Sequence, residues 1–88
     1  MKYHNEREIA EKVLAELKDE LEGICEYNEL YESLIALGMD KEAICIERIA
    51  SDEYRHAEKL WHMLGKFDIE VPTTINTLWD KVEEIFDK

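Results

Sequence analysis

Three side chains in this sequence have the types and spacing of a metal site. Glu53 and His56 are three residues apart, so on a helix they project from one face with their donor atoms close together. A Glu-x-x-His pair of this kind holds iron or manganese in helical bundles. Carboxylate oxygens and imidazole suit Fe(II), Mn(II) and Zn(II), so we expect metal chemistry here if a further carboxylate, Glu20, is brought alongside.

The sequence predicts that Glu20 lies on a long first helix, over about residues 6–37. Asn5 with Glu8 three residues later is typical of a helix start, and apolar residues then recur at helical spacing. No proline interrupts this run. Gly38 fits the end of the helix, because glycine enters the left-handed conformation at little cost.

Two further helices are predicted, at about 40–65 and 74–87, with Asp40 as the cap of the second and Pro72 just before the third. The connection at 38–40 is so short that the first two helices must fold back as an antiparallel hairpin. We therefore expect one all-α domain over residues 1–88. The amphipathic third helix, which carries Trp79, is expected to cover the hairpin or to contact a partner chain.

Helical periodicity places all three candidate ligands toward the core. Glu20 falls within the apolar stripe of the first helix, Glu53 within that of the second, and His56 near its edge. Positions level with one another in this hairpin have residue numbers adding to about 77, and Glu20 comes close to that sum with either Glu53 or His56. We expect the three side chains to be buried and to meet at one height.

A buried carboxylate must be protonated, paired with a cation or bound to metal. No Lys or Arg shares the two stripes, which favours metal, although a metal-free polar network that fixes the helix register remains an alternative. Tyr27 and Glu16 are candidates for a supporting shell around the ligands. The more ordinary interpretations are core packing for Tyr27 and a half-exposed position for Glu16. Cys25 and Cys45 lie too far apart along the hairpin for a disulfide.

Composition narrows the classes of function. The 88 residues include 22 acidic and 11 basic side chains, a formal net charge of −11, with 45% hydrophobic residues. This chain is too apolar for a disordered acidic tail, and its charge disfavours nucleic acid and anionic membranes as partners. Neither a membrane span nor an N-terminal signal region is evident, so a cytoplasmic location is expected.

The Glu20 and Glu53-Tyr54-Arg55-His56 pattern, with Tyr27 after the first Glu, resembles the ferritin-like superfamily, above all rubrerythrin-type di-iron proteins and two-helix encapsulated ferritins. The resemblance covers about residues 13–64. It implies iron, with Mn or Zn as alternatives, and oxidation of Fe(II) by oxygen or peroxide, as in a ferroxidase or a rubrerythrin-like peroxidase. An encapsulin shell is a further partner that it implies, but no docking segment is recognisable after the third helix.

The chain departs from the family because it carries half a site. A di-iron site in a four-helix bundle takes a Glu from each of two helices and Glu-x-x-His from the other two. This chain supplies one of each, which predicts a homodimer, or a higher oligomer built from it, whose two hairpins form the bundle. The rubrerythrin four-Cys iron module is absent from the sequence. Two other hypotheses stay open: an acidic helical interaction module with a buried Glu/His cluster, and a metal that only staples chains together.

Overall fold

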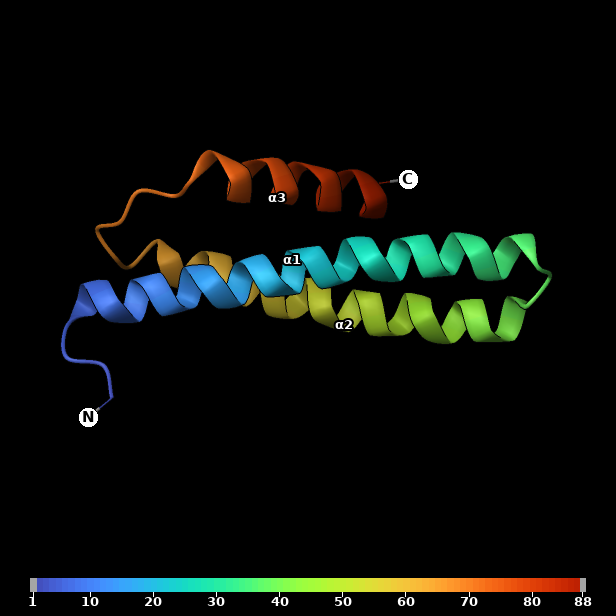
Figure 1. Cartoon of the computed structure of the whole chain (residues 1–88), viewed down its shortest axis with the longest axis horizontal. Coiled ribbons are helices and arrows are strands. Elements are labelled where there is room, and N and C mark those ends of the chain that lie inside the picture. The colour runs from blue at the N-terminus through green and yellow to red at the C-terminus, as the bar shows by residue number, and fades with distance from the viewer. Residues whose placement is uncertain (1, 88) are drawn as a thin grey trace.

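The chain forms an antiparallel helical hairpin and a shorter third helix (Figure 1). The computed structural model describes residues 2–87, so Met1 and Lys88 of the expected domain lie outside the described residues. α1 is Glu6–Ala36, α2 is Asp40–Leu64 and α3 is Thr73–Phe86, and no strand occurs within 2–87. Each helix begins and ends within one residue of the bounds expected from the sequence.

The ends of α1 follow the local chemistry of the sequence. The Asn5 side chain accepts a hydrogen bond from the Glu8 amide at 2.9 Å, while the Glu8 carboxylate accepts one from the His4 amide at 2.8 Å. At the other end Gly38 has a φ of 75°, and the Met39 amide donates to the Leu34 carbonyl at 2.9 Å. This is the glycine-dependent C-terminal motif that turns the chain sharply into α2.

The expected capping role of Asp40 is wrong. Met39 occupies the cap position of α2 and makes no side-chain hydrogen bond there, and Asp40 is the first helical residue. Its carboxylate still favours the helix start, because negative charge near a helix N-terminus interacts well with the exposed amides. The methionine at the cap position has no side-chain oxygen to accept a hydrogen bond from these amides.

The seam between α1 and α2 is built on positions seven residues apart. The buried residues of α2 are Ala43, Ala50, Ala57 and Leu64, and α1 contributes a matching buried row at Ala10, Leu17 and Ile24. A spacing of seven residues brings side chains back to the same face after two turns, as in coiled coils. Small alanines at the seam allow the two helices to approach closely.

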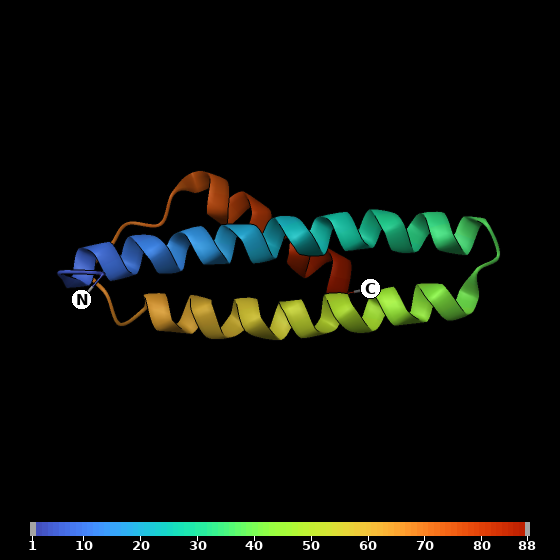
Figure 2. The ribbon, with the colours of Figure 1, turned by 60° about the horizontal axis from the view of Figure 1, so that its bottom comes forward.

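α3 covers one face of the hairpin. Ile75 and Val82 are buried, and the Trp79 ring stacks on Trp61 of α2 with centroids 5.0 Å apart. Figure 2 shows α3 crossing behind α1, with its C-terminal end beside the space between α1 and α2. The hairpin continues well beyond this end (Figure 1). The molecule is consequently elongated, about 50 × 26 × 15 Å.

Two properties of the described helices bear on partners. None of the helices within residues 2–87 is both long and apolar enough to cross a membrane. The face of the hairpin opposite α3 is not covered by any other part of the described chain, as Figures 1 and 2 show from two directions. That uncovered face carries the candidate ligands.

Candidate metal centre

Glu20, Glu53 and His56 lie together across the hairpin. One donor atom from each residue can be chosen so that all three lie within 4.8 Å of one another. His56 Nδ1 is 4.0 Å from Glu20 Oε2 and 3.8 Å from Glu53 Oε1. The antiparallel pairing of α1 with α2 sets this level, and the three-residue spacing on α2 sets the common direction of Glu53 and His56.

The geometry leaves one oxygen without a partner. Glu20 Oε2 is buried from solvent and makes no hydrogen bond within the described structure. Its distance of 4.0 Å to the imidazole nitrogen is too long for a hydrogen bond. Donor atoms that bind one divalent metal through bonds of about 2 Å lie about 3–3.5 Å apart, so small rotations of these side chains would bring the three donors into one coordination shell. Two carboxylates and an imidazole are ligands that suit a divalent transition metal.

The pKa of Glu20 is raised from 4.5 to about 7. The largest cause is burial, which disfavours the charged carboxylate. The next is the adjacent Glu53 carboxyl, which is placed to accept a hydrogen bond from protonated Glu20 and repels the ionised form. Glu16 and Asp19 add further negative charge. A cation between the carboxylates would relieve both effects.

The expectation that all three ligands are buried is wrong for the single chain. The exposed fractions of the side chains are 23% for Glu20, 30% for Glu53 and 56% for His56. The apolar stripe predicted for α2 combines Ala50, Ala57 and Leu64, which form the buried seam, with large residues that lie beside the seam. Ile49 and Met63, two of those large residues, are 41% and 45% exposed.

The candidate ligands instead occupy the middle of a half-exposed surface, which we call the open face. On α2 it consists of two rows with seven-residue spacing, and on α1 of two similar rows. These are Ile46, Glu53 and Leu60; Ile49, His56 and Met63; Glu20, Tyr27 and Leu34; and Ile9, Glu16, Gly23 and Leu30. Apolar residues thus flank the Glu/Glu/His group along both helices.

No hydrogen bond or ion pair among the described residues joins Tyr27 or Glu16 to the group. Tyr27 lines a cleft farther along the hairpin. Glu16 adds negative charge near Glu20. Glu16 forms a 2.7 Å ion pair with Lys12. Cys25 and Cys45 are both free thiols, in agreement with the sequence analysis.

The open face was not predicted from the sequence. The signal that could have found it is the exact seven-residue spacing of Ala43, Ala50, Ala57 and Leu64, which identifies the α1–α2 seam and leaves the neighbouring rows unpartnered. Comparison of the chain with protein-family models, with curated proteins and with solved structures gives no match.

Proposed function

We propose that two copies of this chain pair through their open faces and bind iron at a shared site, where Fe(II) is oxidised by oxygen or peroxide. The resulting assembly is a four-helix bundle of the ferritin-like kind. The observation that carries the proposal is the buried, unpartnered Oε2 of Glu20, which lies in a group with Glu53 and His56 whose donor atoms are within 4.8 Å of one another.

The shared site follows from the number of ligands. One chain offers two carboxylates and one imidazole, too few to hold two metal ions. A two-fold axis through the open face would bring a second Glu20, Glu53 and His56 opposite the first, giving four carboxylates and two imidazoles. The exposed position of His56 supports this arrangement, because 56% of its side chain is accessible on the open face of the single chain.

Each residue has a chemical task in this proposal. Glu20 and Glu53 bind the substrate ions as carboxylates, so Glu20 must release its proton when iron binds. His56 binds as neutral imidazole through one ring nitrogen. Fe(II) held in a pair supplies one electron from each ion to the oxidant, which takes up protons as it is reduced.

The first experiment measures iron per chain after anaerobic Fe(II) loading and desalting. We expect about one iron per chain, since two chains share two ions. Glu53→Ala should lose this iron and remain helical, whereas Glu42→Ala, an exposed carboxylate elsewhere on α2, should retain it. The proposal is wrong if the unaltered chain retains no iron or if both variants retain it equally.

Oxidation is tested separately from binding. The iron-loaded protein should consume oxygen or peroxide while Fe(III) absorbance appears, and Glu53→Ala should not accelerate this reaction. Retained metal with chelator-sensitive stability and no oxidant consumption would support a structural staple instead.

A second candidate function is favoured by the apolar part of the open face. Ile49, Met63 and Ile9 are partly exposed large side chains that would be covered by pairing whether or not metal binds. A non-catalytic helical interaction module built on this face predicts no bound iron and a stability that chelators do not change.

A further inference from the structure

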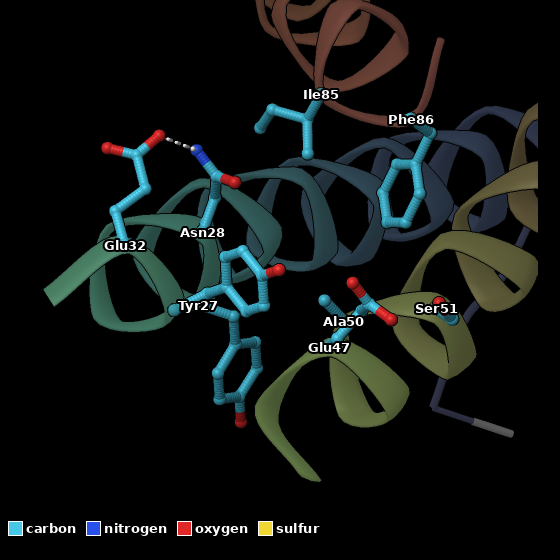
Figure 3. A pocket seen from close by; sticks show the side chains of 9 residues that line it. Tyr27, Asn28, Glu32, Glu47, Ala50, Ser51, Ile85 and Phe86 are labelled. Carbon is cyan, nitrogen blue, oxygen red and sulfur yellow. Dashed lines mark hydrogen bonds between the residues drawn. The ribbon is translucent and has the colours of Figure 1, made fainter. Parts of the chain in front are cut away.

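A cleft of about 510 Å³ opens between the three helices, beyond the C-terminal end of α3. It shares no residue with the Glu20, Glu53 and His56 group. Its walls are Tyr27 and Tyr31 from α1, Glu47 and Ser51 from α2, and Ile85 and Phe86 from α3 (Figure 3). Small-molecule sites have volumes of about 300–1,000 Å³, so this cleft is large enough for a ligand.

The cleft exists because nothing fills the seam at this level. Ala50, which lines it, is 7% exposed and presents only a methyl group. Seven residues later in α2, at Ala57, the seam belongs to the core that α3 covers. α3 ends at Phe86, so the seam at Ala50 is bordered by the last turn of α3 rather than covered by it.

The chemistry of the walls selects a cation. The charged residues lining the cleft are Glu32 and Glu47, and no Lys or Arg is among the lining residues. Glu47 has no cationic partner within 4.0 Å in the described part of the chain, and Glu32 accepts only a 3.3 Å hydrogen bond from the Asn28 amide. Three aromatic rings, of Tyr27, Tyr31 and Phe86, offer faces that attract positive charge.

The polar groups also distinguish among cations. An ammonium group has three N–H donors, and the cleft offers it carboxylate and hydroxyl acceptors from Glu47, Ser51 and the tyrosines. Figure 3 shows the Phe86 ring of α3 on the side toward which the Glu47 carboxylate of α2 points. Ala50, Ile85 and Phe86 provide apolar surface for an alkyl chain. A quaternary ammonium would leave the acceptors unpaired.

We propose that this cleft binds a small aliphatic diamine. One ammonium group pairs with Glu47 and Ser51, the alkyl chain lies against Ile85 and Phe86, and the second ammonium reaches the rim at Glu32. The cleft contains none of the candidate iron ligands, so this proposal does not rest on the iron site, although Tyr27 belongs both to the cleft and to the open face.

The test is calorimetric titration of the protein with putrescine, compared with 1,4-butanediol and with Mg²⁺. The diol has the same length without charge, and Mg²⁺ has the charge without an alkyl chain. We expect saturable binding of putrescine only. Glu47→Gln should weaken it about tenfold, the effect of losing one charge-assisted hydrogen bond, whereas Glu42→Gln, with the same change of net charge outside the cleft, should have less than about a twofold effect.

Nuclear magnetic resonance provides a second measurement that does not depend on the variants. Putrescine should shift the amide signals of Tyr31, Ser51 and Phe86 and leave those near His56 unchanged. The proposal is overturned if putrescine produces no saturable change, if the diol or Mg²⁺ binds as well, or if both glutamine variants weaken binding equally. Equal binding of the diol would mean that apolar surface is sufficient for binding. Equal binding of Mg²⁺, or equal weakening by both variants, would mean that general negative charge is sufficient.

Discussion

Glu20 links proton binding to stability at the scale of a single residue. Its pKa is raised to about 7 by burial and by Glu53, so the native state holds a proton that the unfolded chain, with a pKa near 4.5, has released. The free energy of unfolding changes with pH according to the difference in bound protons between the native and unfolded states. At this residue the native state binds more protons. The contribution of Glu20 is therefore present below about pH 4.5 and is lost as the pH rises through about 7.

The raised pKa of Glu20 predicts how the stability of the metal-free protein depends on pH. Its free energy of unfolding should fall as the pH rises between about 4.5 and 7, and Glu20→Gln should flatten this dependence because glutamine does not titrate. Urea denaturation at several pH values measures it. Glu42→Gln is a suitable control, because Glu42 is an exposed carboxylate that does not contribute to the raised pKa of Glu20. An equal flattening by both variants would show that general charge repulsion is the cause.

His56 offers the cleanest separation of metal binding from folding. Its side chain is 56% exposed, so its removal should leave the hairpin intact. We expect His56→Ala to lower the affinity for Fe(II) or Mn(II) at least about tenfold, as loss of a ligand does, and to change stability without metal by less than about 0.5 kcal/mol. His62→Ala removes an exposed imidazole from the same helix and should retain the affinity. Similar metal binding by both variants would contradict a ligand role for His56.

At the scale of the helices, Trp79 holds α3 against the hairpin. Its ring lies 5.0 Å from that of Trp61 and 6.0 Å from that of Tyr54. Trp79→Ala should lower the free energy of unfolding by about 2–3 kcal/mol, less than the usual loss for a fully buried tryptophan because Trp79 is partly exposed. Chemical denaturation measures the change. A loss below about 0.5 kcal/mol would mean that the other core residues of α3, such as Ile75, Val82 and Phe86, hold it in place without Trp79.

The helices were predictable because local signals agree with one another. Asn5 with Glu8, Gly38 and the helical periodicity each depend only on neighbouring residues, and the structure confirms them. The meeting of Glu20 with Glu53 and His56 followed from the antiparallel register. The burial of these residues could not be derived in the same way. A hydrophobic stripe cannot distinguish a face that packs within the chain from one left for another surface, and here the intrachain seam is formed by alanines.

At the scale of the whole molecule, the shape indicates an incomplete core. The radius of gyration is 15.1 Å, whereas a compact domain of this length has about 12 Å. Among residues 2–87, only α3 covers the hairpin, and it covers one face of it. A chain of this size buries about 60–65% of its unfolded surface, so pairing through the open face would add core where a single chain has least.

The final prediction compares two isoleucines on α2. Ile49 is 41% exposed and belongs to the open face, in one row with His56, whereas Ile44 is 48% exposed and lies on a different side of the helix. Ile49→Glu should shift the protein from dimer to monomer, because pairing would then bury an unpaired charge at the interface. Ile44→Glu introduces the same charge without this effect. Sedimentation equilibrium measures the masses. If the dimer survives Ile49→Glu but dissociates with Ile44→Glu, the interface lies on the wrong side of α2 for a shared iron site. If both variants are monomers, added charge alone prevents pairing.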